Sequence, residues 1–250
     1  MNAAEAQLRR VVADYSRRLH SRGWVANHDG NLSVRLAGGR FLCTPGATSK
    51  AEVSEASLVV VDQSGAVVGR GRVFSEIGLH LTVYRQRADV GAVVHAHPVT
   101  ASGFGAAGCA LDVPFWPEAV VSLGPGVPLV PLAAPGPAAA EALAPYVADH
   151  DAVLLAGNGV LAWGVDVEQA YLRLELVEHL ARIALVAHQL GGVRPLPAAL
   201  LPPLLEARKQ AGLGPQARGQ RPAAVPSMPS VPAADLAAII RQEITAALKG

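Results

Sequence analysis

The stretch FSEIGLHLTVYRQRADVGAVVHAHP, residues 74–98, decides the fold class and holds the candidate chemistry of this chain. Its first half predicts a helix from Glu76 to about Arg87, with Ser75 as the capping residue. Its second half is a run of small β-formers and predicts a buried strand. Because side chains alternate along a strand, His95 and His97 point to the same face of the sheet.

Two imidazoles on one face can converge on one cation, at about 2.0–2.1 Å from each ring nitrogen. The H-x-H pair alone is explained equally well as two polar residues at an exposed strand end. Glu76 favours the cation, because a carboxylate at the start of the preceding helix can act as a ligand or as a general base. Its alternative role is that of a favourable charge at a helix N-terminus. His80, one turn further on, is assigned to packing or to solvent.

The sequence on either side predicts helices and strands in irregular alternation. Asp166 and Gln169 form a capping pair for a long helix that ends at Gly191. The remaining expected elements are helices at 4–22 and 136–149, strands at 30–36, 39–44 and 126–133, a hairpin at 57–69 and a strand pair at 151–159 and 160–164. These elements predict an α/β domain with a mainly antiparallel sheet and flanking helices, in three layers.

The composition changes after about Ala211, so the domain is expected to cover residues 1–211. Residues 212–231 are rich in Pro and Gly and predict a flexible linker. Residues 232–250 predict a short amphipathic helix, whose apolar stripe consists of Leu236, Ile239, Ile240, Ile244 and Leu248. A helix this short is marginal alone in water. It is therefore expected to dock on its own domain, on a sister subunit, or on another protein as a tethered peptide.

Composition excludes several functional classes. The net charge is +1 and aromatic residues make up 4% of the chain, which argues against a nucleic-acid partner. Charges or prolines interrupt every apolar run, so no membrane-spanning helix is expected, and the N-terminus lacks the apolar centre of a signal peptide. Cys43 and Cys109 form no redox or metal motif, which indicates a reduced, cytoplasmic setting.

Four motifs occur together in a recognisable order: HDGNLSVRL, CTPGATSK, the opening stretch and LLAGNGVLAWG. In order and spacing they resemble the class II aldolase/adducin family, over roughly residues 5–190. The family includes fuculose-phosphate and rhamnulose-phosphate aldolases and ribulose-phosphate 4-epimerase. The resemblance implies a four-fold symmetric homotetramer with active sites between the subunits.

The resemblance also implies a divalent metal, usually Zn²⁺. His95 and His97 would be two of its ligands, and a histidine of an N-H-G motif would be the third. Glu76 would be the catalytic acid/base. Asn31, next to Gly30, would hydrogen-bond an enediolate or phosphate oxygens. Such a site would cleave or form a C–C bond in a short sugar or sugar phosphate, because the metal stabilises the enediolate that cleavage leaves.

The chain departs from this pattern at the third ligand. Asn158 stands where the third histidine is expected, and a neutral amide oxygen is a poor zinc ligand. The site could bind metal weakly, could be inactive, or could take His179 as a substitute ligand. His179 lies on the helix stripe Leu172, Leu176, His179 and Ile183, which is expected to face the core. Asn158 would then bind metal-bound water or substrate.

The substrate-binding segments depart as well. The T-P-S-G segment appears as Thr44, Pro45, Gly46 and Ala47, and S-S-E appears as Phe74, Ser75 and Glu76. Backbone N–H groups of Gly46 and Ala47 could still hold a phosphate, helped by Lys50. The resemblance implies that Glu118 extends towards a neighbouring subunit's site, and its alternative role is that of a solvated loop carboxylate.

These observations leave several functions open. The first is a zinc-dependent aldolase, joining a dihydroxyacetone-phosphate-type donor to a small aldehyde. The tail resembles peptides that recruit enzymes into bacterial microcompartments, so a shell protein is an expected partner. An epimerase, dehydratase or decarboxylase on the same scaffold, and a non-catalytic adducin-like protein, are the alternatives.

Overall fold

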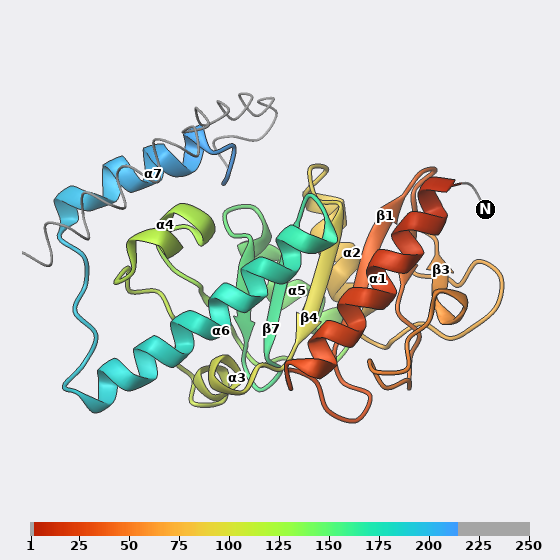
Figure 1. Ribbon diagram of the computed structural model, residues 1–250, viewed down its shortest axis with the longest axis horizontal. Coiled ribbons are helices and arrows are strands. Elements are labelled where there is room, and N and C mark those ends of the chain that lie inside the picture. Colours follow the sequence, from red (N-terminus) through yellow and green to blue (C-terminus); the bar gives the residue numbers. More distant parts are fainter. Residues whose placement is uncertain (1–2, 215–250) are drawn as a thin grey trace, which may run out of the picture. The chain divides into compact units, whose positions relative to one another are not determined.

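A computed structural model describes residues 3–214 of the chain, which form a layered α/β fold around one sheet (Figure 1). The seven strands follow the order β3-β2-β1-β4-β7-β6-β5. Only the β5–β6 pair is parallel among these strands, and every other neighbouring pair is antiparallel. The expectation of a mainly antiparallel sheet between helices is therefore confirmed.

The strands are short and almost fully buried. Their bounds are β1 Asn31–Leu36, β2 Arg40–Cys43, β3 Val59–Val61, β4 Ala92–Ala96, β5 Leu129–Val130, β6 Ala152–Leu155 and β7 Val160–Gly164. The α-helices are α1 Ala3–Ser21, α2 Ile77–Gln86, α3 Val99–Ala106, α4 Pro117–Leu123, α5 Pro137–Val147, α6 Val167–Gln189 and α7 Leu201–Gln210. Two short 3-10 helices, η1 Glu55–Ser57 and η2 Ala198–Leu200, complete the described elements.

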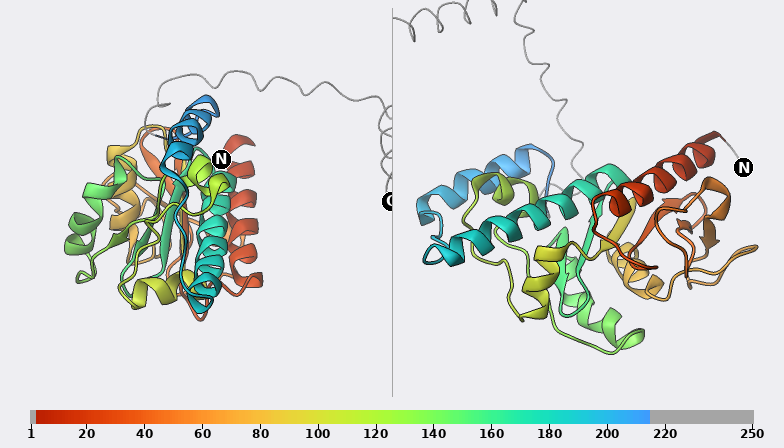
Figure 2. Two further views of the ribbon diagram at one scale, coloured as in Figure 1. Left: turned by 90° about the vertical axis from the view of Figure 1, so that its left-hand side faces the viewer. Right: turned by 60° about the horizontal axis from the view of Figure 1, so that its bottom comes forward.

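Helices cover both faces of the sheet. Helices α1 and α6 lie on one face, and α2 and α5 lie on the other, as the left view of Figure 2 shows. Alternation along β4 divides its side chains between these two layers. Val94 packs in the cluster of α1 and α6, whereas Val93 packs in the cluster of α2 and α5.

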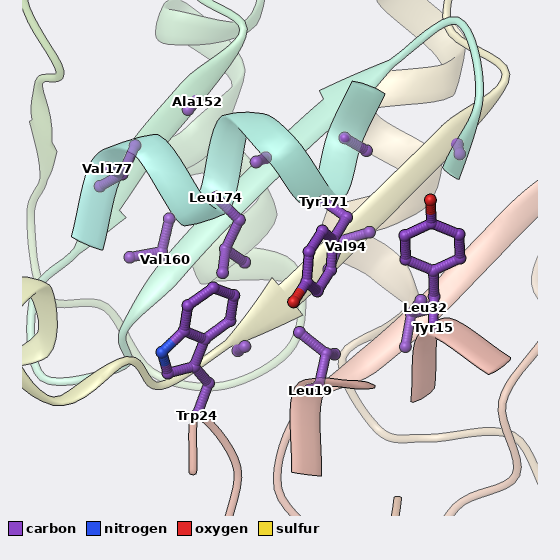
Figure 3. Close-up of a cluster of buried hydrophobic side chains, with 14 of the residues drawn as sticks. Tyr15, Leu19, Trp24, Leu32, Val94, Ala152, Val160, Tyr171, Leu174 and Val177 are labelled. Carbon is purple, nitrogen blue, oxygen red and sulfur yellow. The ribbon is translucent and has the colours of Figure 1, made fainter. Parts of the chain in front are cut away.

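The layer of α1 and α6 is held by aromatic side chains (Figure 3). The ring of Tyr171 lies 5.1 Å from that of Tyr15 and 5.5 Å from that of Trp24, centroid to centroid. Leu19 and Leu174, both fully buried, fill the space beside these rings. This packing fixes the segment after α1, which leads into β1 and the candidate site.

Most of the predicted elements are present, but two local predictions are wrong. The second strand of the 57–69 hairpin is reduced to a single bridge between Val61 and Val67. Ser75 does not cap α2, because Glu76 occupies the N-cap position and no side chain caps the helix. Helices α3, α4 and α7 were not predicted.

The long helix α6 begins as expected, since the Asp166 side chain accepts a hydrogen bond from the Gln169 backbone N–H at 2.8 Å. Within residues 3–214, no helix is both long and apolar enough to cross a membrane. The predicted amphipathic helix 232–250 and nearly all of the predicted linker 212–231 lie outside the described residues.

Candidate functional site

His95 and His97 converge at the end of β4. The strand period places both rings on the α2 side of the sheet, and His95 is fully buried while His97 is half-buried. Their Nε2 atoms lie 3.1 Å apart. The prediction that the two imidazoles share one face is confirmed.

The outer nitrogen of each ring faces an acceptor. His95 Nδ1 lies 2.9 Å from the carbonyl oxygen of Val160, and His97 Nδ1 lies 3.6 Å from a carboxylate oxygen of Asp29. A carbonyl only accepts, so Nδ1 of His95 carries a proton, and in the neutral ring Nε2 presents a lone pair. Outer acceptors that fix the tautomer in this way are typical of metal-binding histidines.

The Glu76 carboxylate lies beside this pair at the start of α2. Its Oε2 atom is 3.4 Å from Nε2 of His95. Two amides hold the carboxylate in place: Asn31 Nδ2 donates to Oε2 at 2.9 Å, and Asn158 Nδ2 donates to Oε1 at 2.6 Å. The structure therefore brings Glu76, Asn31, Asn158 and the two histidines together.

These contacts keep Glu76 ionised. Burial alone would raise the pKa of its carboxyl group, but the positive charge that His95 can carry and the bonds from Asn158 and Asn31 outweigh burial and bring that pKa down to about 2. At neutral pH the residue is thus a proton acceptor that is already aimed into the site.

A buried chain of hydrogen bonds orients Asn31. His80 Nε2 lies 2.7 Å from Asn31 Oδ1, and His80 Nδ1 lies 2.7 Å from Ser33 Oγ, which in turn lies 2.9 Å from the Tyr84 hydroxyl. Burial, and then the charge of His95, lower the pKa of His80 to about 3, so its ring is neutral. Since Asn31 donates to Glu76, its Oδ1 accepts, and the His80 proton is on Nε2.

The backbone around the site is too close for side chains at two glycines. A Cβ on Gly30, at φ +70°, would lie 3.0 Å from the carbonyl oxygen of His95. A Cβ on Gly159, at φ +74°, would lie 2.6 Å from the ring of His97. Packing therefore requires glycine at position 30. Glycine at position 159 allows the β6–β7 turn to pass close to His97, which brings Asn158 to Glu76.

Two side chains of the site, His95 and His97, are placed to act as ligands of one divalent cation. The two Nε2 atoms converge, the outer nitrogen of His95 has a carbonyl acceptor, and that of His97 lies 3.6 Å from a carboxylate oxygen of Asp29. Within residues 3–214, however, no three His, Cys, Asp or Glu side chains are grouped so that they could hold one metal ion. The residue at the remaining position is Asn158, so the site differs from a centre of three imidazoles.

His179 does not complete the set. The buried stripe of α6 runs through Ala170, Leu174, Val177 and Ala181, so Leu172 is 50% exposed and His179 is exposed. The expectation that the His179 stripe faces the core is wrong, because α6 is apolar on two faces and the sheet takes the other one. His179 lines a separate cavity of 770 Å³ along α6, and so does Glu118.

The predicted phosphate segment is largely engaged with protein. Thr44 is buried, and its hydroxyl accepts a hydrogen bond from the Leu32 backbone N–H at 3.1 Å. The Gly46 N–H donates to the carbonyl of Arg72 at 2.8 Å, so it is not free to bind a phosphate. Ala47 is exposed and has the positive φ of 53° that suits a tight turn.

Lys50 lies beneath this segment and is only 2% exposed. Its Nζ donates to the carbonyls of Thr48, at 2.7 Å, and His28, at 3.1 Å. The ammonium group therefore ties residues 44–50 to the loop that leads to Gly30 and Asn31. Lys50 is therefore a buried positive charge on the protein side of this segment.

A second cavity opens directly beside the carboxylate. It has a volume of 290 Å³, and Ser75, Glu76 and Asn158 line one side. Its other walls are mostly apolar and include Leu79, Val130, Leu132, Ala139 and Leu155. Glu76 is the only charged residue among the described residues that line it.

Sequence reasoning missed His80, Ser33 and Asp29. Two of them carried a signal: His80 is four positions after Glu76 on one helix, and Ser33 is two after Asn31 on one strand, so each shares a face with a predicted residue. Asp29 carried no comparable signal, because it lies in a loop.

The chain is similar to several known proteins. Residues 10–185 match the model of the family described as Class II Aldolase and Adducin N-terminal domain. An L-fuculose phosphate aldolase of Methanococcus maripaludis is 28% identical over 174 residues, which are 69% of this chain and 93% of the relative. A 3-oxo-tetronate 4-phosphate decarboxylase of Haemophilus influenzae is 30% identical over 181 residues, 69% of this chain and 84% of the relative.

Solved structures are similar as well. An L-fuculose 1-phosphate aldolase superposes with a TM-score of 0.74 at 27% identity, covering 80% of this chain and 95% of the other. YgbL from Escherichia coli, whose description leaves the activity open between aldolase, epimerase and decarboxylase, gives a TM-score of 0.75 at 27% identity, covering 80% of this chain and 99% of the other.

Proposed function

Because the chain belongs to the class II aldolase and adducin family, we propose that it is a lyase that cleaves or forms the C–C bond beside the carbonyl of a short sugar or sugar phosphate. The observation that carries this proposal is the Glu76 carboxylate, held by two amides 3.4 Å from His95. His95 and His97 are the residues that would hold a divalent cation, such as Zn²⁺. When bound, such a cation supplies Lewis-acid charge next to the carbonyl and hydroxyl oxygens of the substrate.

In cleavage, Glu76 takes the proton of the substrate hydroxyl on the carbon beyond the bond that breaks. The O–H electron pair becomes the C=O bond of the departing aldehyde, and the C–C pair moves into the ketone fragment as an enediolate. Glu76 then returns its proton to the enediolate carbon, which gives the ketone. Asn31 and Asn158 keep the carboxylate aligned through both transfers.

The apolar cavity beside Glu76 favours an aldehyde fragment that is small and uncharged. Its volume of 290 Å³ suits a short chain, and leucine, valine and alanine side chains form most of its walls. A phosphate would have to bind elsewhere, since Glu76 would repel it. The exposed loop at Ala47 is the candidate for that end of the substrate, with the buried positive charge of Lys50 beneath it.

Decarboxylation is the second candidate, because it also breaks a C–C bond next to a carbonyl and leaves an enediolate, and a decarboxylase is among the relatives. The cavity argues for the aldol reaction instead, since a substrate carboxylate there would face Glu76 among apolar side chains. Product analysis decides between them. The purified chain is given dihydroxyacetone phosphate with a panel of short aldehydes, and separately a panel of 3-oxo acid phosphates assayed for CO₂.

A non-catalytic, adducin-like role is the third candidate. It predicts no turnover with any panel member and no change in behaviour on substitution of the site. One divalent ion per chain, lost in His95→Ala, together with C–C bond cleavage lost in Glu76→Gln, would support the enzyme. Turnover that survives Glu76→Gln unchanged would refute the mechanism.

We also propose that the chain forms a homotetramer. Helix α6 exposes Leu172, Leu185 and Val186, and its C-cap Leu190 is exposed as well, with exposed fractions of 46–83%. Several large exposed apolar side chains on one helix favour its use as a protein interface. Light scattering on wild type and Leu172→Glu tests this, with a smaller assembly expected for the variant. An unchanged mass in the variant, or a monomeric wild type, would contradict it.

The tail supports a separate proposal, drawn from its sequence alone: residues 232–249 recruit the enzyme to a bacterial microcompartment shell protein within the cytoplasm. Deleting residues 216–250 should leave activity intact and abolish co-purification with shell proteins. Co-purification that persists after the deletion would refute it.

A further inference from the structure

Asn158 lies between the Glu76 carboxylate and the ring of His97. Its Nδ2 atom donates to Glu76 Oε1 at 2.6 Å, and the next residue, Gly159, lies so close to His97 that an added Cβ would be 2.6 Å from the imidazole ring. A carboxylate only accepts, so the amide nitrogen must be the atom that faces Glu76. With the nitrogen on Glu76, the oxygen Oδ1 is the remaining polar atom of the planar amide.

The β6–β7 turn holds this orientation. Asn158 donates its backbone N–H to the Leu155 carbonyl at 3.0 Å, and the Leu155 N–H donates to Gly159 at 2.8 Å. The side chain is thus anchored at its backbone by the turn and at its nitrogen by Glu76. Both anchors engage other atoms of Asn158, so Oδ1 is the atom that would act as a donor to a cation held by His95 and His97.

An amide oxygen and an imidazole nitrogen favour different metals. Imidazole suits Zn²⁺ and similar borderline ions, whereas neutral oxygen donors suit Mn²⁺, Mg²⁺ and Ca²⁺. Every divalent site of this kind still binds Zn²⁺ more tightly than Mn²⁺ in absolute terms. The identity of the third donor therefore changes the ratio of the two affinities more than their order.

We propose that Asn158 sets the metal preference of this centre: its amide oxygen acts as the third donor and lowers the selectivity for Zn²⁺ over Mn²⁺. The inference rests on the proposed function, since it takes His95 and His97 as ligands. It goes further by assigning Asn158 two tasks. One is to fix the general base, and the other is to tune the cation.

The test measures metal affinity on the full chain, without any substrate. Apo-protein is titrated with Zn²⁺ against a chromophoric chelator, and with Mn²⁺ while free Mn²⁺ is followed by electron paramagnetic resonance. Asn158→His should raise the Zn²⁺ affinity at least about tenfold and the Mn²⁺ affinity much less. Asn158→Ala, which removes the oxygen, should weaken Mn²⁺ more than Zn²⁺. Both variants should therefore raise the ratio of the Zn²⁺ affinity to the Mn²⁺ affinity.

Two further variants make the outcome unambiguous. Gln210→His adds an imidazole on the exposed helix α7 and should leave the ratio unchanged. His95→Ala should lose both metals. If His95→Ala loses them but neither Asn158 variant moves the ratio, the inference is wrong and the proposed metal site stands. If His95→Ala binds both metals as wild type does, the metal site itself is wrong.

Discussion

The ring of His80 donates from Nε2 to Oδ1 of Asn31 at 2.7 Å, across 49 positions of the chain. This contact ties the middle of α2 to the first residue of β1. Because Asn31 in turn donates to Glu76, the buried histidine orients the side chain that holds the proposed general base. We therefore expect His80 to act as a positioning residue.

Substitution of His80 tests that role. His80→Phe leaves Asn31 Oδ1 without its donor and should lower kcat about tenfold to a hundredfold, with KM changed less than about threefold. His80→Gln can still donate to Asn31 and should recover most of the activity. Thermal melting shows whether the variants are folded. Equal loss in both variants would point to a packing role only.

Glu76 is expected to contribute most of the chemistry that the protein chain itself supplies. Glu76→Gln keeps the shape of the side chain but removes its basicity, and should lower kcat by about a hundredfold or more. Steady-state assays with the best substrate of the aldehyde panel give the measurement. Glu141→Gln, an exposed carboxylate on α5, is the matched control and should behave as wild type.

Lys50 makes stability depend on pH. Burial lowers the pKa of its ammonium group to about 8, with Asp29 opposing the shift. The unfolded chain therefore binds one more proton than the folded chain between about pH 8 and the ordinary lysine value, so the free energy of unfolding gains a contribution that rises with pH there. Urea denaturation of wild type and Lys50→Met should give a stability difference that moves in favour of wild type from pH 7 to pH 10.

The control for that series is Lys209→Met on α7, where the side chain is 41% exposed. Its effect on the free energy of unfolding should be nearly the same at both pH values. A Lys50→Met difference that is equally flat would show that the buried ammonium titrates normally.

Among the buried carboxylates of residues 3–214, Asp151 is expected to contribute most to the free energy of unfolding. It is 1% exposed and pairs with Arg87 at 3.0 Å, Arg173 at 3.1 Å and Arg208 at 2.6 Å. Removing it would leave three guanidinium groups without their shared anion, so Asp151→Ala should cost about 3–5 kcal/mol of unfolding free energy.

Chemical denaturation measures this loss, and Asp89→Ala supplies the comparison. Asp89 also pairs with Arg87, at 2.7 Å, but its side chain is 35% exposed, so a clearly smaller loss is expected. Equal losses for the two variants would show that the buried cluster is not the stabilising feature. Because Arg208 is on α7, the Asp151 variant should also loosen that helix, which amide exchange would detect.

The parts of the site that depend on local backbone geometry could be predicted from the amino-acid sequence. The period of a strand puts His95 and His97 on one face, and the start of a helix just before that strand supplies Glu76. The same local rules placed β1, β2, β6 and β7 and the long helix α6. The resemblance of four ordered motifs extended these elements to a family.

The way in which distant segments meet could not be predicted from the sequence and depends on the packing of the whole domain. The burial of α6 depends on which of two apolar stripes packs against the sheet, and the stripe of Ala170 and Leu174 is buried while that of His179 is not. Whether Gly46 could bind an anion depended on the carbonyl of Arg72, which lies in another segment. From the sequence, Asn158 is interpreted as the replacement of a histidine metal ligand. In the fold it is the donor that holds Glu76, because a turn between two strands brings it there. Such contacts join residues far apart in the chain, and no local periodicity encodes them.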